Sequence, residues 1–225
     1  MSAVLDLYTP EHWSRLPPPT VFRGWLTGVG SRDTPPNACR LLTIFAGVTY
    51  SLGYQWRSGG AKGADEAIEH GVLTHPHYRP GTALTDLSLE IYLPWNGFAP
   101  IQGGPKKYED FSRGYINTPL LSPYEHAKDA ITYYHPLGDR IREKRGVWAL
   151  HTRNMFQPLG QDLKTPSERL YCWAPLKGED DIEGGTRTAW QVARKHRIPT
   201  VNLYNGDAQS RLLAFLAKYA QTALT

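Results

Sequence analysis

The sequence predicts an α/β fold of the doubly wound type, in which helices cover both faces of a mainly parallel sheet. Three observations predict it. Short apolar runs with the length of buried strands alternate with segments whose apolar residues recur at helical spacing. Glycine-rich turns follow several of these runs. The chain has 225 residues, which suits one domain over 1–225. Because such alternation is typical of βαβ units, the expected architecture is Rossmann-like.

The first part of the chain supplies three strands and two helices. The run WLTGVG at 25–30 has the character of a buried strand that opens into a glycine turn. Apolar residues spaced along 38–52 predict the helix that follows it. A short second strand is expected at 54–57, a second helix at 64–72 and a third strand at Leu89–Leu93.

The alternating pattern stops between residues 95 and 160, which we interpret as an insertion that covers the ligand pocket. Residues 95–121 are rich in Gly, Pro, Lys and aromatic side chains and show no clear period. The string SPYE at 122–125 resembles a capping box with proline at the first helical position, so a helix is expected to run to about Tyr134. Helical spacing then predicts one further helix over 137–160.

The sheet is expected to resume near the C-terminal end. Apolar runs at 170–174 and 200–204 predict two strands, with a helix between them that begins at a glycine-rich turn. A last helix is expected over 208–224, where one broad side is apolar. Residues 1–20 contain acidic residues, His and prolines and are expected to form an N-terminal arm.

Composition favours a soluble protein that binds an anionic ligand. The net charge is +4 and the isoelectric point is near 9.0, although 25 basic residues face 21 acidic ones. No run approaches the roughly 20 apolar residues of a membrane span, and the start lacks the pattern of a secretory signal, so we expect a cytoplasmic protein without membrane partners. Cys39 and Cys172 are expected to be reduced and buried. His75 and His77 have no third ligand at suitable spacing, so neither a metal nor another cofactor is expected.

Three glycine-rich turns are the candidate ligand site. In a doubly wound sheet the turns after the strands lie at the carboxyl edge, where ligands bind at the point at which the strand order reverses. Glycine allows positive φ and close approach of the backbone, and the following helix offers free N–H groups to a phosphate. The residues expected to bind it are Gly30, Ser31, Arg32, Ser58, Gly59, Gly60, Ala61, Gly63, Gly184, Gly185, Thr186 and Thr188.

These turns carry a resemblance to a known family. The strings GVGSR at 28–32, SGGAKGAD at 58–65 and GGTRT at 184–188 resemble motifs of the SLOG superfamily of Rossmann-like nucleotide-binding proteins, which includes DNA-processing protein A and the Lonely Guy phosphoribohydrolases. SGGAKGAD is most similar to the YspA/YpsA-related branch, which is often found in phages and prophages. The resemblance implies that the chain binds a phosphorylated nucleotide or nucleotide derivative at the carboxyl edge of the sheet.

Whether the chain also hydrolyses an N-glycosidic bond is left open by the third turn. The segment 183–191 is similar to the PGGxGTxxE motif of Lonely Guy enzymes, but Glu183 stands in place of the proline, Arg187 in place of the later glycine and Gln191 in place of the glutamate. A neutral amide cannot act as a carboxylate base or stabilise an oxocarbenium ion by charge. The resemblance therefore implies phosphate binding more directly than catalysis.

A few charged and polar side chains are further candidates, each with an ordinary alternative. Asp65 and Glu69 are four residues apart on one helix face and are the candidate catalytic acids, although Asp65 suits a helix start and Glu69 a solvated surface. Arg32 suits bidentate phosphate binding or an ion pair with an acid. Arg153 and Asn154 are candidates to reach the pocket from the insertion, and a surface salt bridge is the alternative.

Three functions remain in competition. The leading hypothesis is nucleotide binding with possible hydrolysis of the N-glycosidic bond, and release of free base would distinguish it from a non-enzymatic sensor or sequestering protein. The third hypothesis is a binder of single-stranded DNA like DNA-processing protein A, for which affinity would fall steeply with salt. Homo-oligomers are compatible with all three, because the sequence does not fix the oligomeric state.

Overall fold

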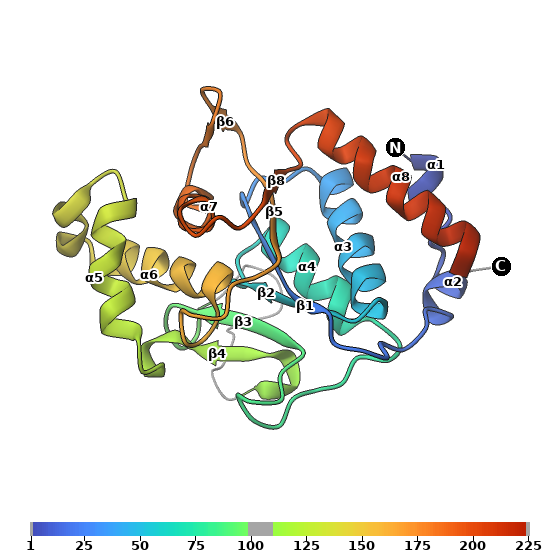
Figure 1. Cartoon of the computed structure of the whole chain (residues 1–225), viewed down its shortest axis with the longest axis horizontal. Coiled ribbons are helices and arrows are strands. Elements are labelled where there is room, and N and C mark those ends of the chain that lie inside the picture. Colours follow the sequence, from blue (N-terminus) through green and yellow to red (C-terminus); the bar gives the residue numbers. More distant parts are fainter. Residues whose placement is uncertain (1, 99–109, 224–225) are drawn as a thin grey trace.

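The computed structural model describes residues 2–98 and 110–223 and confirms the predicted α/β class (Figure 1). Its centre is a sheet of six parallel strands in the order β4-β3-β2-β1-β5-β8. The strands are β1 (Gly24–Gly30), β2 (Tyr54–Ser58), β3 (Leu89–Leu93), β4 (Tyr115–Asn117), β5 (Arg169–Trp173) and β8 (Thr200–Asn202).

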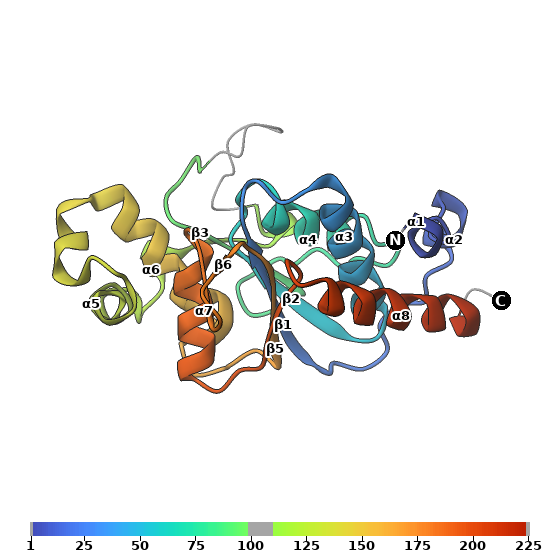
Figure 2. The ribbon, with the colours of Figure 1, turned by 90° about the horizontal axis from the view of Figure 1, so that it is seen from above.

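Helices cover both faces of the sheet, as Figures 1 and 2 show. One face carries α3 (Pro36–Ser51), α4 (Ala64–Leu73) and α8 (Gly206–Ala223). The opposite face carries α5 (Tyr124–Tyr134), α6 (Arg145–Leu159) and α7 (Thr186–Lys195). Each face has its own cluster of buried apolar side chains, which explains why the strands are apolar on both sides.

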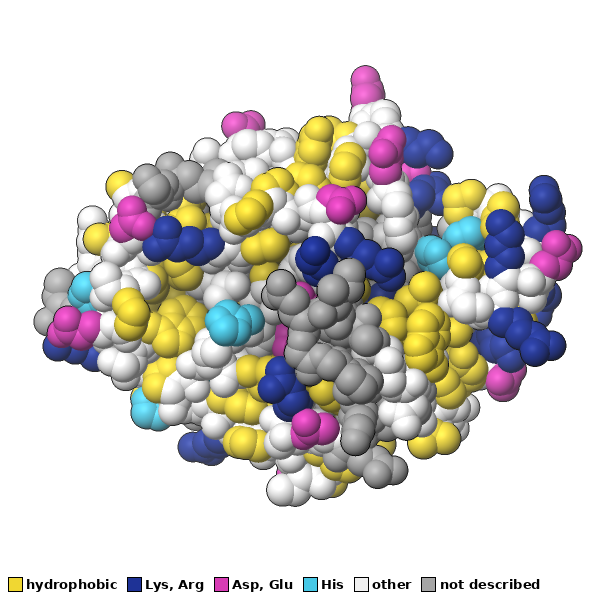
Figure 3. All heavy atoms as spheres, turned by 180° about the vertical axis from the view of Figure 1, so that it is seen from behind, with side chains coloured by type: hydrophobic (Ala, Val, Ile, Leu, Met, Phe, Trp, Pro, Cys, Tyr) yellow, Lys and Arg dark blue, Asp and Glu magenta, His cyan; other side chains and the backbone are white. Residues whose placement is uncertain are grey.

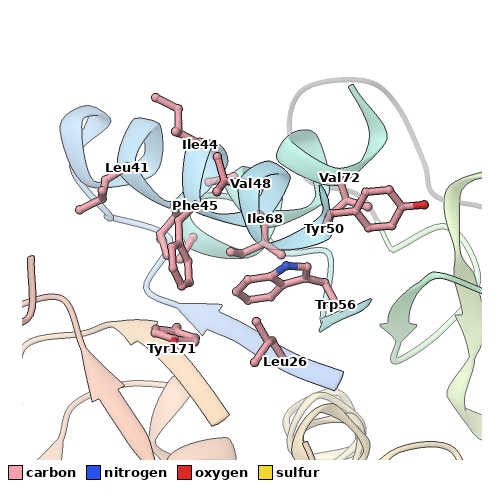
Figure 4. Packing of buried hydrophobic residues seen from close by; sticks show 14 of the residues in the cluster. Leu26, Leu41, Ile44, Phe45, Val48, Tyr50, Trp56, Ile68, Val72 and Tyr171 are labelled. Carbon is pink, nitrogen blue, oxygen red and sulfur yellow. The ribbon is translucent and has the colours of Figure 1, made fainter. Parts of the chain in front are cut away.

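Aromatic rings fill the core between α3 and the sheet (Figure 4). The Phe45 ring on α3 meets the Tyr171 ring of β5 at 4.7 Å and the Trp56 ring of β2 at 5.9 Å, both edge to face. Trp56 is fully buried, and its indole Nε1 donates to Thr49 Oγ1 at 3.0 Å. These contacts hold α3 against β2 and β5.

The strand order reverses between β1 and β5. From β1 the chain adds β2, β3 and β4 on one side and then returns to place β5 and β8 on the other. Gly30, at the carboxyl end of β1, is in register with Trp173 at the carboxyl end of β5. Connections that leave these two strands in opposite directions open a crevice at this edge, the usual place for a ligand in such sheets.

The N-terminal segment packs on the face formed by α3, α4 and α8. It contains α1 (Ser2–Leu5) and α2 (Pro10–Ser14). Tyr8 Oη donates to the carbonyl oxygen of Leu216 on α8 at 2.8 Å, and Trp13 Nε1 donates to the carbonyl oxygen of Thr74 after α4 at 2.9 Å. These bonds attach the segment to the domain.

Residues 95–160 differ most from the prediction. The single helix expected over 137–160 is wrong: a 3-10 segment, η3 (Gly138–Glu143), precedes α6, and Lys144 separates them with φ −113° and ψ 73°. Pro123 is the N-cap of α5 and no side chain of the described residues caps the helix, so the expected capping box does not form. The part expected to lack regular structure contains β4, η1 (Phe111–Arg113) and η2 (Thr118–Leu120). Its residues 99–109 lie outside the described residues.

Three smaller findings complete the fold. A short antiparallel hairpin of β6 (Leu176–Lys177) and β7 (Asp181–Ile182) leads into α7 and was not predicted. Both cysteines are free thiols, but Cys39 is only half-buried, whereas Cys172 is fully buried. In the ranges 2–98 and 110–223, no helix has the length and apolar character needed to cross a bilayer.

Candidate ligand site at the strand-order reversal

A cavity of about 470 Å³ lies where the strand order reverses. Four segments far apart in the sequence supply most of its lining: the turn after β1, Ala61 and Asp65 around the start of α4, one side of α6, and the turn that begins α7. Its volume is within the roughly 300–1,000 Å³ of small-molecule sites. The predicted site residues that line it are Gly30, Ser31, Arg32, Ala61, Asp65, Gly184, Gly185 and Thr186. The predicted residues that do not line it are Ser58, Gly59, Gly60, Gly63, Glu69 and Thr188.

The second glycine-rich turn packs against the first turn and against Arg153, and its Ala61 lines the cavity. Gly63 has φ +88°, and a Cβ added there would lie 2.4 Å from the Ser31 carbonyl oxygen. A Cβ on Gly59 would overlap the Arg153 guanidinium. Ser58 is buried, and its Oγ donates to the Gly28 carbonyl oxygen at 2.6 Å. The glycines of this turn therefore allow close packing inside the protein and do not themselves line the cavity.

Asp65 joins the first two turns to α6. One carboxylate oxygen accepts from the Gly30 amide at 3.0 Å, and the other accepts from the Ala61 amide at 3.4 Å and from Arg153 Nη1 at 3.4 Å. Only 3% of the Asp65 side chain is exposed. Burial raises the pKa of this carboxyl group, and the Arg153 guanidinium and the two amides oppose the rise. With partners on both oxygens, Asp65 has a structural role in the lining of the cavity.

Two guanidinium groups line the cavity. Arg153 extends from α6 and is buried beside Asp65, and burial lowers its pKa while Asp65 opposes the fall. Arginine keeps its proton in proteins, so Arg153 remains a cation. Arg32 is exposed, and in the described part of the chain its side chain makes no hydrogen bond or ion pair. The positive charge of Arg32 is therefore available to an anion.

The third turn presents backbone donors to the same cavity. Asn154 Nδ2 donates to the Gly185 carbonyl oxygen at 2.9 Å and so fixes the turn from α6. The amides of Gly185 and Thr186 make no hydrogen bond with any other residue in the described ranges. A Cβ on Gly184 or Gly185 would meet nothing within 4 Å, so the backbone here faces open space. Free amides at a helix start favour an anion.

The Thr186 side chain strengthens this arrangement. Thr186 is only 7% exposed and lines the cavity. Its Oγ1 has no hydrogen-bond partner among the described residues, and the oxygen remains accessible to solvent. Because buried hydroxyl groups are normally paired, the Thr186 hydroxyl is placed to bond to a molecule in the cavity.

A histidine pair separates this cavity from a second one. His151 of α6 lines both cavities, and its Nδ1 lies 2.6 Å from Thr188 Oγ1. The ring centroid of His135 is 4.3 Å from that of His151. Burial, with smaller contributions from His135 and Arg153, lowers the pKa of His151 to about 4. The predicted residue Thr188 thus lines the second cavity and contacts His151.

Two residues singled out by the sequence lie away from the cavity. Glu69 is buried on the β4 side of α4, where its Oε1 accepts from Tyr115 Oη at 2.7 Å and from Arg113 at 3.3 Å. Gln191 points to the β6–β7 hairpin, where its Nε2 donates to Asp181 Oδ1 at 2.8 Å. Neither side chain is placed to act on a ligand in the first cavity.

The sequence interpretation missed His151 and Gln157 as lining residues. A signal for both was present, because residues 150, 151, 153, 154 and 157 share one side of a helix, and polar residues occupy most of that side. Arg153, Asn154 and Gln157 are all buried. A buried polar stripe on a helix requires partners, and here the glycine-rich turns and the cavity supply them.

The two histidines at 75 and 77 have structural contacts. His75 Nε2 lies 2.7 Å from Ser51 Oγ, and its Nδ1 accepts from the His77 amide at 3.1 Å. Across residues 2–98 and 110–223, no group of three or more His, Cys, Asp or Glu side chains has the arrangement of a metal site.

Comparisons with protein-family models, with curated proteins and with solved structures give no match in any of the three cases.

Proposed function

We propose that the chain binds a phosphorylated nucleotide or nucleotide derivative in the first cavity. The observation that carries the proposal is the convergence of unpaired donors at the strand-order reversal: the Arg32 guanidinium, the Gly185 and Thr186 amides and the Thr186 hydroxyl. These donors suit a phosphate, which offers several acceptor oxygens and negative charge. The resemblance of the turns to SLOG nucleotide-binding proteins points to the same ligand class.

Carboxylates at the rim favour a compact ligand with hydroxyl groups. Asp33 and Glu183 are exposed and line the same cavity as the phosphate donors. Carboxylates accept hydrogen bonds from ribose hydroxyls in other doubly wound domains. Their negative charge disfavours a long run of phosphates at the rim, so the cavity suits one nucleotide better than a long strand of single-stranded DNA.

The exposed cations elsewhere give little support to DNA binding. Figure 3 shows Lys and Arg side chains gathered at the end of the molecule formed by α5 and η3. One of them, Arg142, pairs with Asp129 at 2.9 Å and with Asp139 at 3.3 Å. Lys128 pairs with Glu125 at 3.1 Å. These acids offset part of the positive charge that a nucleic-acid backbone would require.

The geometry favours binding without glycosidic hydrolysis. Asp65 is the sequence-predicted acid that lines the cavity, and it is buried and already accepts hydrogen bonds from Gly30, Ala61 and Arg153. We therefore expect the wild-type protein to release no free base from nucleoside monophosphates over hours, as measured by chromatography. Release of base that Asp65→Asn lowers about a hundredfold would instead identify Asp65 as a general acid or base.

Replacement of Arg32 tests the binding site. The test ligand is whichever of AMP, GMP, CMP or UMP the wild type binds. We expect Arg32→Ala to lower the affinity for it by about 10-fold or more, since a charge-assisted contact contributes about 1.5–3 kcal/mol. The affinity for the corresponding nucleoside should fall far less, and isothermal titration calorimetry measures both affinities. Arg23→Ala is the matched control, because Arg23 is exposed just before β1 at the opposite edge of the sheet. Equal losses for nucleotide and nucleoside would contradict the assignment.

A further inference from the structure

A second cavity of about 390 Å³ adjoins the first. His151, Glu183, Gly184 and Gly185 line both cavities, so the two meet at the turn that begins α7. The second cavity is enclosed by the residues after α5, by the β6–β7 hairpin and by α7. A ligand bound at the turn therefore has space on both sides of its phosphate.

The charges that line the two cavities differ. In the first cavity, Arg32 and Arg153 face three carboxylates, those of Asp33, Asp65 and Glu183. In the second cavity, Lys177 and Arg187 face the single carboxylate of Glu183, which the two cavities share. The side chains that line the second cavity therefore include two cations and one carboxylate, a balance that suits an anionic group.

Both cations of the second cavity can serve a ligand. Lys177 is exposed on β6, and its ammonium group makes no hydrogen bond or ion pair with residues in the described ranges. Arg187 Nε pairs with Asp181 Oδ2 at 2.5 Å, and Asp181 does not line this cavity. The Arg187 Nη groups make no hydrogen bond with described residues, so they retain donors for a second acceptor.

His135 adds a neutral donor. Its Nδ1 accepts from the Leu137 amide at 3.2 Å, so the proton of the neutral ring resides on Nε2. Burial and the nearby Arg187 and Lys144 lower the pKa of His135, which keeps the ring neutral at pH 7. The ring lines the second cavity beside the two cations and is able to donate one hydrogen bond.

We propose that the second cavity binds a second phosphate of the same ligand, which makes the ligand class a nucleoside diphosphate. The nucleoside occupies the first cavity, the α-phosphate lies against Gly185 and Thr186, and the β-phosphate lies near Lys177 and Arg187. Thr186 supports the placement of the α-phosphate, because it is nine-tenths buried, its hydroxyl group has no partner among the described residues, and it lines the first cavity directly after Gly185, which lines both cavities. This inference rests on the proposed nucleotide binding.

The experiment compares AMP with ADP and GMP with GDP by calorimetry at fixed ionic strength without divalent metal. The diphosphate should bind about 10-fold more tightly than the monophosphate, the effect of one added charge-assisted contact. Lys177→Met should reduce this ratio to about 2 or less and leave the monophosphate affinity unchanged. Lys195→Met is the matched control. Like Lys177, Lys195 is exposed, but it lies on α7 and does not line the second cavity.

The outcomes separate the two proposals. Equal affinity for monophosphate and diphosphate, or a diphosphate preference that survives Lys177→Met, would overturn the second phosphate site and leave nucleotide binding intact. Failure of every nucleotide to bind the folded wild type would overturn both. Because Lys177 is exposed on a short hairpin, the variant should fold, and circular dichroism verifies this.

Discussion

At the scale of single residues, Asp65 has the greatest structural importance in the site. It connects the turn after β1, the turn after β2 and α6 through three hydrogen bonds, all of them inside the protein. A buried carboxylate that pairs with a buried guanidinium holds both in place, because either charge alone would be costly. Asp65 therefore positions Arg153 and the Gly30 turn for a ligand and is not itself free to react.

We expect Asp65→Asn to destabilise the protein by about 3 kcal/mol, because Arg153 would remain buried without an opposite charge. Urea unfolding measures the change. The double variant Asp65→Asn/Arg153→Met should recover part of the loss, since it removes the uncompensated cation. Asp139→Asn is the control, because Asp139 pairs with Arg142 at the exposed surface and should stay near wild-type stability. A loss no larger than that of the control would contradict the structural role of Asp65.

Two glycines should respond differently to alanine. Gly63 has φ +88° and packs against Ser31, so Gly63→Ala should cost about 2 kcal/mol or more of stability. Gly185 has φ −65° and faces open space, so Gly185→Ala should keep or slightly raise stability but weaken nucleotide binding. Thermal unfolding and calorimetry on both variants test this contrast. The reverse pattern would mean that the second turn, and not the third, lies against the ligand.

At the scale of elements, strand positions follow closely from the sequence, because central parallel strands are short apolar runs next to glycines. The strands expected at 25–30 and Leu89–Leu93 agree with β1 and β3 to within one residue. By contrast, β4 has three residues, and only its pairing with β3 makes it a strand. The break at Lys144 was equally hidden, because apolar spacing continues across it from η3 to α6.

The contact between α3 and the residues after α4 should make stability depend on pH. His75 pairs with Ser51 at the end of α3, and burial, together with nearby His77, lowers the pKa of His75 to about 4. The pKa in the unfolded chain is about 6.5. Between these values the unfolded chain binds a proton that the folded chain excludes, so stability falls as pH decreases from about 6.5 to 4. The loss is at most about 3 kcal/mol and is absent above pH 7.

Urea unfolding at several pH values between 4 and 7 measures this slope. His75→Gln should make the slope shallower, whereas His126→Gln should leave it unchanged because His126 is exposed. An identical slope in wild type and His75→Gln would show that His75 is not buried in its neutral form.

At the scale of the whole molecule, the site exists only because distant segments meet. The turn after β1, the polar side of α6 and the start of α7 are more than a hundred residues apart in places and converge where β1 and β5 diverge (Figure 1). The sequence indicated the first and third turns through their glycines. It could not indicate that the glycines of the second turn pack against protein while Ala61 of that turn lines the cavity, because glycines that contact protein and glycines that face a cavity look alike in a sequence.

The direction of Gln191 is likewise a property of the whole fold. In the sequence it takes the place of a motif glutamate, but the β6–β7 hairpin places Asp181 beside it, on the outer side of α7. The loss of that carboxylate therefore removes nothing from the described cavity. Under the proposed function, binding depends on the groups that line the cavity, and Gln191 is not one of them.

The most direct test of the central claim is a crystal structure of the chain grown with a saturating nucleoside monophosphate. We predict electron density for the phosphate within hydrogen-bonding distance of the Gly185 and Thr186 amides, with the Arg32 guanidinium on the solvent-facing side of the phosphate. A nucleotide bound elsewhere, for example in the cavity beside β8 that Arg169 and Arg211 line, with the cavity at the strand-order reversal empty, would contradict it.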